Sequence, residues 1–390
     1  MRVVICGAGI AGLTLAWCLE RQGHEPLIVE RAPRLRDDGY MLDFFGTGLD
    51  VAERLGLWPD LERLHDPVER LVFVDDRGRQ RVCLPYAQMR SRLFRGRHFN
   101  FMRGALEGIL YNKLRGRAGI CFGTTVRSFT ATKRAVEVTL SNGATISADL
   151  LVGADGVHSR IRRLTFGEDR AFLQPLGYTA AAYIIAAPPP ALRLDRSVFT
   201  LTAPGRQLTL YPIDGDRTAT FFAYRNDDSS RGQGLDPCEE LSRVYHGLGW
   251  LVLEALTRCP AARDIYLDDV VQVDMSAWHR GRVVLVGDAC QCLSPFAGQG
   301  AAMAMTGAYV LAQELERAPS TPLEALASYE HRLRSLIVAQ QRSARRLARW
   351  VVPRHPWQVM ARDVLARVAL WPLASSLLRP GASPGKLRLA

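Results

Sequence analysis

The chain has 390 residues, of which 48% are hydrophobic and 23% are charged, a composition typical of globular proteins. Its formal net charge of +11 first suggests a nucleic-acid-binding protein. However, residues 331–390 contain twelve of the 50 Lys and Arg residues and only one of the 39 acidic residues. The remaining 38 basic and 38 acidic residues cancel, which argues against a basic nucleic-acid groove in the main body.

Export and membrane signals are missing from the sequence. It has no run of 18 apolar residues, and glycines interrupt the N-terminal apolar stretch too early for a signal peptide. We therefore expect a cytoplasmic protein without a transmembrane segment. The eight cysteines are too few for a disulfide framework, and only Cys290 and Cys292 lie close together, without metal-site spacing. We expect reduced thiols and no metal centre.

The N-terminus carries a dinucleotide-binding pattern. Residues 2–6 form an apolar β-branched run, GAGIAG follows, and the next residues suit a helix. A second apolar run at 26–29 ends in Glu30. Gly7 permits the tight turn, Gly9 lets backbone amides approach a pyrophosphate, Gly12 allows close helix packing, and Glu30 is placed to bond a ribose hydroxyl. The alternative is a glycine-rich turn without a ligand.

Residues 71–99 are predicted to add strands and a flap. This stretch contains four arginines that we expect to be solvated, with contact to a nucleotide phosphate or an anionic substrate as the alternative: Arg90, Arg92, Arg95 and Arg97. Further along, the Asn142-Gly143 pair predicts a hairpin turn in a small β-ribbon.

Two later strands each run into a glycine and an aspartate. Residues 148–152 precede GADGVHSRIRR, which contains Asp155, and residues 283–286 precede GDACQC, which contains Asp288. Open α/β sheets bind ligands at the carboxyl ends of their strands. Each aspartate alone is equally well interpreted as the cap of the following turn.

Residues 171–225 alternate aromatic and β-branched runs with Pro, Gly and Asp turns, which predicts an antiparallel sheet. Its aromatic side chains are candidates for a substrate chamber, although such a row more often belongs to a core: Tyr178, Tyr183, Phe199, Tyr211, Phe222 and Tyr224. Because side chains alternate along a strand, Phe222 and Tyr224 share a face that Phe221 does not. The C-terminal segment predicts an amphipathic helix over about 323–350 and a second helix ending near 370.

The order and spacing of the three glycine motifs resemble the single-component FAD-dependent (class A) monooxygenases of the para-hydroxybenzoate hydroxylase family, in their smaller type without a C-terminal thioredoxin-like domain. The resemblance covers about residues 1–345. It implies an α/β fold: a discontinuous Rossmann-like FAD-binding domain (1–70, 100–170 and 270–322), an antiparallel-sheet substrate domain (71–99 and 171–269), and C-terminal bridging helices and tail (323–390).

The resemblance also assigns roles to individual residues. The ADP half of FAD is expected at Gly7, Gly9, Gly12, Glu30 and Arg31, with Arg103 on a helix beside the cofactor. Asp155 is expected to serve both FAD and the nicotinamide nucleotide, with Ser159 and Arg162 completing its motif. Gly287 and Asp288 match the motif for the ribityl or ribose chain. The turn beside the flavin ring matches Pro295, Gly298, Gln299, Gly300 and Ala301.

Some positions depart from the pattern of many relatives. Cys290 and Gln291 stand where a second alanine and a histidine are common, Ala302 where some relatives carry Asn, and Thr306 and Gly307 where an acidic pair is common.

The resemblance implies an oxidoreductase that needs no catalytic side chain of its own, because FAD carries the chemistry. NAD(P)H would reduce FAD, and a flavin C4a-(hydro)peroxide formed with molecular oxygen would hydroxylate, epoxidise or insert oxygen in a Baeyer-Villiger reaction. The expected substrate is an aromatic or polyketide-like secondary metabolite, for example in antibiotic biosynthesis, and the expected assembly is a monomer or homodimer.

Two alternatives remain open. One is a flavoprotein reductase, desaturase or flavin-holding cyclase on the same fold without oxygen transfer, which the departures at Gln291, Ala302 and Gly307 motivate. The other is a membrane-surface or partner-binding protein that acts through its basic C-terminal segment. The main interpretation of that segment is a helix that bridges the two domains.

Overall fold

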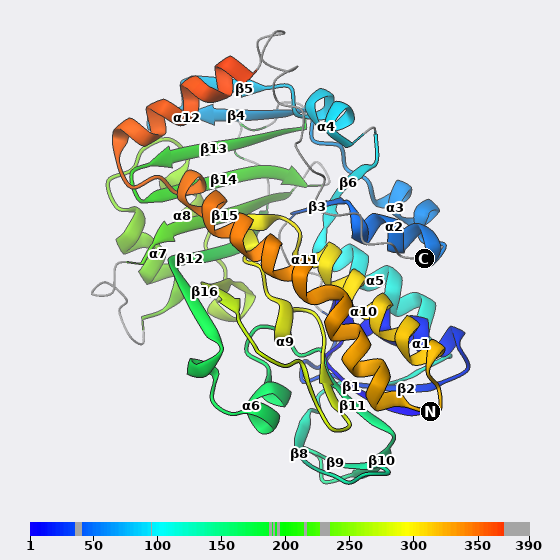
Figure 1. Cartoon of the computed structure of the whole chain (residues 1–390). Coiled ribbons are helices and arrows are strands. Elements are labelled where there is room, and N and C mark those ends of the chain that lie inside the picture. The colour runs from blue at the N-terminus through cyan, green and yellow to red at the C-terminus, as the bar shows by residue number, and fades with distance from the viewer. Residues whose placement is uncertain are drawn as a thin grey trace.

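Two large β-sheets organise the chain. The computed structural model describes residues 1–35, 41–94, 96–186, 189, 192, 196–213, 217–226 and 235–369. Arg95 and the tail beyond residue 369 lie outside these residues. The predicted α/β fold is confirmed: a largely parallel sheet and an antiparallel sheet lie at opposite ends of the molecule, and helices connect them (Figure 1).

The parallel sheet has six strands in the order β17-β18-β11-β1-β2-β7. In chain order these are β1 (Arg2–Cys6), β2 (Glu25–Val29), β7 (Gly119–Cys121), β11 (Leu150–Gly153), β17 (His279–Arg280) and β18 (Val283–Leu285). All neighbours pair in parallel except the edge pair β17 and β18. Val3, Val4 and Ile5 are fully buried because helices and a separate three-stranded ribbon together cover the sheet, which explains the uninterrupted apolar run in the sequence.

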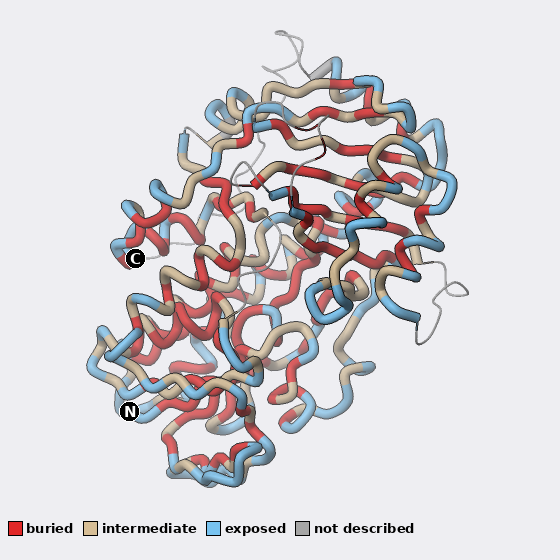
Figure 2. Tube along the Cα trace, turned by 180° about the vertical axis from the view of Figure 1, so that it is seen from behind, coloured by how far each residue is buried: buried red, intermediate tan, exposed pale blue. Residues whose placement is uncertain are grey.

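Helices from distant parts of the sequence pack around this sheet. They are α1 (Ile10–Arg21), α2 (Thr47–Arg54), α3 (Trp58–Leu64), α5 (Arg103–Leu114), α6 (Arg160–Phe166), α9 (Asp288–Gln291) and α10 (Gly300–Arg317). Most of their inward side chains belong to one continuous apolar core, visible as the buried centre in Figure 2.

The predicted strand 148–152 divides into two. Ala148 ends β10 (Thr145–Ala148), which belongs with β8 (Val126–Ala131) and β9 (Val136–Leu140) to a separate three-stranded ribbon. The chain turns at Asp149, whose carboxylate accepts a hydrogen bond from Arg2 N at 2.7 Å, and enters the parallel sheet as β11. The predicted Asn142-Gly143 turn joins β9 to β10, with Gly143 at φ +91°.

The second sheet has seven strands in the order β16-β12-β15-β14-β13-β4-β5. They are β4 (Arg70–Val74), β5 (Gln80–Leu84), β12 (Leu173–Ala186), β13 (Ser197–Ala203), β14 (Arg206–Ile213), β15 (Arg217–Arg225) and β16 (Tyr266–Val273). The predicted antiparallel arrangement of 171–225 is confirmed by the pairing of β12 to β15. The stretch 71–99 supplies β4, β5, α4 (Tyr86–Phe94) and β6 (His98–Met102), which pairs with β3 (Met41–Phe45).

One face of this sheet is covered by α7 (Pro237–Tyr245) and α8 (Val252–Thr257). Tyr183, Phe222 and Tyr224 are buried between the sheet and these helices. The rings of Tyr183 and Phe222 stack at 5.5 Å, and the Tyr224 hydroxyl donates to Glu240 at 2.6 Å. This placement corrects the expectation that these three side chains line a substrate chamber, because their face of the sheet packs on helices.

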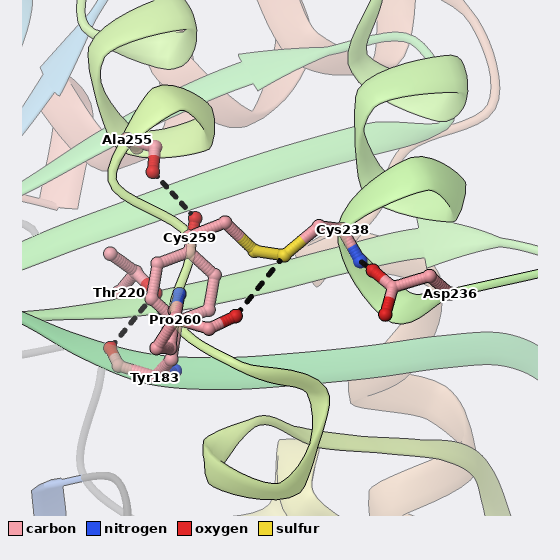
Figure 3. Close-up of a disulfide and its surroundings, with 7 residues drawn as sticks. All are labelled: Tyr183, Thr220, Asp236, Cys238, Ala255, Cys259 and Pro260. Carbon is pink, nitrogen blue, oxygen red and sulfur yellow. Dashed lines mark hydrogen bonds between the residues drawn. A yellow bond between two sulfur atoms is a disulfide. The ribbon is translucent and has the colours of Figure 1, made fainter.

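Cys238 and Cys259 form a disulfide, so the expectation that every cysteine is a reduced thiol is wrong for this pair. The bond links α7 to the segment after α8, across 21 residues of sequence (Figure 3). Cys238 also receives a cap at its backbone N–H, because the carboxylate of Asp236 accepts from it at 2.8 Å. The spacing of the two cysteines matches no common motif, and only the fold brings them together.

The C-terminal segment forms α11 (Pro322–Val351) and α12 (Pro356–Ala369), which confirms the two predicted helices. α11 packs on α10 at one end, and its Ala348 joins an apolar cluster with Tyr178 and Val270 of the seven-stranded sheet. At its centre, Gln341 Nε2 donates to the carbonyls of Val273 and Cys292 at 2.8 and 3.1 Å. The helix therefore connects both sheet layers, as its diagonal course in Figure 1 shows.

Candidate functional site

Three strand ends meet at one edge of the parallel sheet. β18, β11 and β1 are neighbours in that sheet, so their carboxyl ends lie side by side. Backbone hydrogen bonds tie these ends together: Val286 N donates to Gly153 O at 2.9 Å, and Ala154 N donates to Cys6 O at 2.8 Å. The predicted motifs at Gly7, Asp155 and Asp288, far apart in sequence, thus share one edge, as the topology of open α/β sheets requires.

The three glycines of the first motif are required for different structural reasons. Gly7 has φ +112°, and a Cβ there would overlap the carbonyl of Ala154. A Cβ at Gly12 would overlap the carbonyl of Gly7, so α1 packs directly on the turn. At Gly9, by contrast, the nearest side-chain atoms to a Cβ would be those of Glu107 and Arg103, at 3.8 and 3.9 Å. Gly9 therefore borders open space, at the N-terminus of a helix that no side chain caps.

Glu30 closes this turn from the end of β2. Its carboxylate accepts hydrogen bonds from Ala8 N and Ala32 N, each at 2.8 Å. The carboxylate is thus held at the strand ends, although in this structure its partners are backbone amides. Arg31 is exposed beside it.

Asp288 lies at the same edge, shortly after β18. The residue is exposed to solvent, and the protein around its carboxyl raises the pKa by desolvation, against the opposing charge of Arg103. Arg103 begins α5 and pairs with Glu107 at 3.2 Å, so a carboxylate, a guanidinium and the Gly9 turn border one space.

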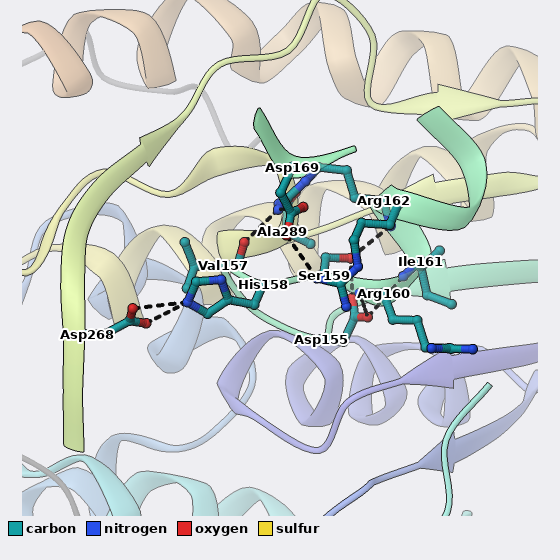
Figure 4. A network of polar contacts seen from close by, with 11 residues as sticks. Asp155, Val157, His158, Ser159, Arg160, Ile161, Arg162, Asp169, Asp268 and Ala289 are labelled. Carbon is teal, nitrogen blue, oxygen red and sulfur yellow. Dashed lines mark hydrogen bonds and ion pairs between the residues drawn. The ribbon is translucent and has the colours of Figure 1, made fainter. Parts of the chain in front are cut away.

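Asp155 is turned toward its own helix. Its carboxylate accepts hydrogen bonds from Ser159 Oγ, Arg160 N at 2.7 Å and Ile161 N at 3.1 Å (Figure 4). Burial raises its pKa against these hydrogen bonds. Asp155 therefore caps the start of α6, which is the simpler of the two interpretations that its sequence allowed.

Arg162 is a buried connection behind this edge. Its guanidinium is fully buried and donates to Ala289 O at 2.9 Å, to Val157 O at 2.7 Å and to Asp169 at 2.5 Å. Because Ala289 follows Asp288 in α9, this side chain fixes the position of the Gly287-Asp288 motif relative to α6. Gly287 adds a close contact on the other side, since a Cβ there would lie 2.7 Å from Ala11 Cβ.

His158 links the two sheet layers beside this network. Its Nε2 lies 2.8 Å from a carboxylate oxygen of Asp268, on β16 of the seven-stranded sheet. The hydrogen bond and charge of Asp268 raise the pKa of His158 above its ordinary value of 6.5, against the effect of partial burial. The protonated imidazolium is therefore the form that binds Asp268.

This pair predicts a pH-dependent contribution to stability. Because the pKa of His158 is raised by folding, the contribution is fully present below the unfolded value of 6.5 and is lost as pH rises through the folded pKa. We expect the difference in free energy of unfolding between the wild type and Asp268→Asn to be largest in mildly acidic solution, where His158 is protonated and paired, and to shrink as pH rises through the pKa of His158. Urea unfolding of both proteins across this range measures it, with exposed His331→Gln as the control. A difference that stays constant with pH contradicts the assignment.

The last motif forms a turn and a helix start. Pro295–Ala297 is a 3-10 turn, Gly298 is left-handed at φ +63°, and Gln299 precedes α10 without a side-chain cap. A Cβ at Gly298 or Gly300 would meet nothing within 4 Å. The N-terminus of an 18-residue helix is thus open at these two glycines, and the side chain of Gln299 does not cap it.

The departures from the resembling family are explained by helix packing. Gln291 Nε2 donates to the Tyr329 hydroxyl at 2.6 Å, and a Cβ at Gly307 would lie only 2.6 Å from Gln291 Oε1. Gly307 therefore makes room for Gln291. In the same way Ala302 packs directly against Gly48 of α2, where any Cβ would overlap it. These positions form a second, self-consistent set of contacts between α9, α10, α11 and α2.

A half-buried cation was missed by the sequence analysis. Arg90, expected to be solvated, pairs with Asp43 and lies within 5.0 Å of the ring centroids of Phe45, Tyr86 and Phe94. Burial lowers its pKa to about 10. Arg97 is also engaged, by Asp50 and Glu53, whereas Arg92 is exposed. The spacing of Tyr86, Arg90 and Phe94 by four residues was the available signal.

Two of the chamber candidates lie on the face of the seven-stranded sheet that α7 and α8 leave uncovered. Tyr211 accepts a hydrogen bond at its hydroxyl from Met41 N at 2.6 Å, which joins the sheet to β3. Tyr178 packs edge-on against Phe296 of the Pro295–Ala297 turn, at 5.4 Å. Phe199 points to the covered face. Phe221, not counted among the candidates, joins the cluster around Tyr178.

Comparison with known proteins identifies relatives along most of the chain. Residues 1–343 match the family model described as FAD binding domain. The FAD-dependent monooxygenase asL4 of Sarocladium schorii is 31% identical over 81% of this chain and 76% of its own length. A flavin-dependent monooxygenase of an unknown prokaryotic organism is 31% identical over 87% of both chains. An uncharacterised Mycobacterium tuberculosis protein, Rv1260, is 31% identical over 87% of this chain and 91% of its own.

Solved structures share the architecture. Tetracycline destructase Tet(51) has a TM-score of 0.79 and 28% identity, over 94% of this chain and 96% of its own. HpxO of Klebsiella pneumoniae, solved with FAD and uric acid, has a TM-score of 0.77 and 24% identity, over 94% and 93%, and supports the fold alone.

Proposed function

The chain belongs to the FAD-binding-domain family of flavin-dependent monooxygenases and is an FAD-dependent oxidoreductase; on that premise we propose that it uses NAD(P)H and molecular oxygen to insert one oxygen atom into an aromatic or polyketide-like small molecule. The observation that carries the proposal is the convergence of the Gly9 turn, Arg103, Asp288 and the open N-terminus of α10 around one sheet edge.

The residues at this edge fit FAD. The open space beside Gly9 and the uncapped start of α1 suit a pyrophosphate. The exposed Asp288 carboxylate suits hydroxyl groups of the ribityl or ribose chain, and the start of α10 suits the electron-rich edge of the ring. Bound FAD would supply the redox chemistry, accepting a hydride from NAD(P)H and activating oxygen.

The protein contributes binding and positioning. Arg162 holds α9, and therefore Asp288, against α6. We propose that the layer around the parallel sheet is the FAD domain and that the seven-stranded sheet is the substrate domain. Its uncovered face, with Tyr211 and Phe221, is the proposed wall of the substrate chamber. The similarity to a protein named tetracycline destructase is in keeping with a polycyclic, polyketide-like substrate.

The alternative, an enzyme without oxygen transfer, is motivated only by the residues that depart from the family pattern. The structure gives these residues another explanation. Gln291, Gly307 and Ala302 are explained by contacts between helices, with Tyr329 and Gly48 as partners. None of these contacts involves the open side of the Gly9 turn or the Asp288 carboxylate.

The variant Gly9→Ala tests the proposed pyrophosphate site without disturbing the fold. We expect this variant to fold like the wild type, because its Cβ would meet no protein atom closer than 3.8 Å, and to bind FAD at least about tenfold more weakly, because the methyl group fills space next to the pyrophosphate. Gly12→Ala is the matched comparison and is expected to lose stability, since its Cβ overlaps Gly7 O. Flavin titration and thermal unfolding distinguish the two. Unchanged flavin affinity in Gly9→Ala would contradict the proposal that the pyrophosphate of FAD lies beside Gly9.

The reaction itself is tested with the flavin-loaded enzyme. Oxidation of NADPH is measured across a panel of aromatic and polyketide compounds under labelled oxygen. We expect one labelled oxygen atom in the product of any compound that stimulates NADPH oxidation without releasing peroxide. Consumption of NADPH with an unlabelled product would establish a reductase or cyclase instead.

A further inference from the structure

A cavity of about 380 Å³ lies where the start of β12 meets the junction of α11 and α12. Four arginines line it, from β15, α11 and the α11–α12 link: Arg225, Arg345, Arg349 and Arg354. His355 adds a fifth basic side chain, and no aspartate or glutamate is among the described residues that line the cavity. None of its lining residues belongs to the sheet edge with Gly9 and Asp288.

Two of these guanidinium groups are held in place by neutral partners. Arg225 lies 4.9 Å from the ring centroid of Tyr178 and donates to its hydroxyl at 3.0 Å. Arg345 Nε donates to Gln272 Oε1 at 2.6 Å, and Gln272 is itself buried and fixed by the Leu293 carbonyl. Because neither partner is charged, these contacts position both cations without neutralising them, and no described acid forms an ion pair with either. Arg225 Nε is buried and has no hydrogen-bond partner among the described residues.

The other two arginines also lack acidic partners in the described part of the chain. Arg349 and Arg354 are exposed at the rim and form no ion pair there. The one acid of residues 331–390, Asp363, is buried and pairs with Arg81 and Arg362 at 2.9 and 3.0 Å. Arg349 and Arg354 therefore keep charges that no described acid compensates, next to a concave surface where the potentials of the four arginines add up.

We propose that this cavity is a binding site for the phosphate group of an anionic ligand, separate from the cofactor edge. Single exposed arginines are ordinary, but a concave set with two members preoriented by Tyr178 and Gln272 is not. The guanidinium fork matches phosphate oxygens in charge and geometry. The phosphate can come from a nucleotide or from a lipid headgroup. A lipid headgroup is considered because α12 exposes apolar side chains that could enter a membrane interface beside the cavity. Trp357, Met360 and Val364 are 63%, 63% and 56% exposed.

The site is tested by titrating the flavin-loaded protein with inorganic pyrophosphate in a calorimeter at constant ionic strength. Arg349→Gln/Arg354→Gln removes two cavity charges. Arg342→Gln/Arg346→Gln is the matched control, because it removes two exposed charges from α11 that do not line the cavity. We expect saturable binding that weakens about tenfold or more in the cavity pair and less than about twofold in the control pair. Equal thermal unfolding of both variants excludes a folding defect.

Two results overturn the proposal: absence of saturable pyrophosphate binding in the wild type, or equal weakening in both variant pairs, which would indicate diffuse charge. The source of the phosphate is distinguished by competition. NADPH that displaces pyrophosphate in the wild type and in the control pair, but binds weakly to the cavity pair, identifies a nucleotide. The same pattern of displacement and weakened binding with phosphatidylglycerol vesicles identifies a lipid headgroup. Displacement by neither identifies a small free phosphate, and each of these three outcomes supports the site.

Discussion

Asp288→Ala is expected to purify as a folded but colourless protein. Its carboxylate is the acceptor proposed for the sugar-chain hydroxyls of FAD, and loss of a hydrogen bond to a charged group weakens binding by about ten- to a hundredfold. The measurement is the flavin absorbance at about 450 nm per mole of purified protein, followed by titration with FAD. Asp264→Ala, which removes an exposed carboxylate paired with Arg263, is the control and is expected to stay yellow.

The raised pKa of Asp288 indicates that the loss of flavin in this variant would not result from a loss of stability. Because the surrounding protein raises that pKa, the ionised carboxylate opposes folding at neutral pH. Its removal is therefore expected to leave the free energy of unfolding of the flavin-free protein unchanged or slightly higher. An Asp288→Ala protein that retains a full complement of flavin would show that the proposed contact does not hold the cofactor.

Arg162→Met is expected to lower the free energy of unfolding by about 3–5 kcal/mol, the range for breaking a buried ion pair from one side. The change leaves the carbonyls of Val157 and Ala289 without their arginine donor and takes one of the two arginine partners from Asp169. Burial opposes the ionised form of Asp169, but its contacts with Arg162 and Arg163 hold its pKa below the ordinary value, so the carboxylate is charged when its partner is removed.

Arg163→Met provides a matched control for this prediction. Arg163 pairs with the same Asp169 at 2.8 Å, but its side chain is 40% exposed, so its loss is expected to cost at most about 1 kcal/mol. Urea unfolding of the flavin-free proteins gives both values. Similar losses in the two variants would show that Arg162 is not the connection that holds α9.

The parts of the fold that depend on local sequence could be predicted. The buried strand at 2–6, the glycine turn after it and the amphipathic α11 each follow from a pattern within a few neighbouring residues. The meeting of Gly7, Asp155 and Asp288 at one edge required a further rule, that parallel strands carry their ligands at their carboxyl ends. Which strands are neighbours comes only from the structure.

Features that depend on which surfaces face each other could not be predicted. Alternation correctly puts Phe222 and Tyr224 on one side of β15 and Phe221 on the other, but it does not say which side α7 and α8 cover. The disulfide of Cys238 and Cys259 needs the same three-dimensional information. The partial burial of Arg90 depends on its ion pair with Asp43, a residue 47 positions earlier that strand pairing brings opposite α4.

The course of α11 limits how the enzyme can exchange its ligands. A helix of 30 residues is about 45 Å long, and this one is anchored to both layers, with Gln341 bonded at the point where the chain leaves β16 and α9. A hinge that opened the two layers like a clamshell would have to break these contacts together. Traffic of substrate and electron donor is therefore expected to proceed through local rearrangement of short segments while the frame stays rigid, so that turnover depends on loop motion and not on domain closure.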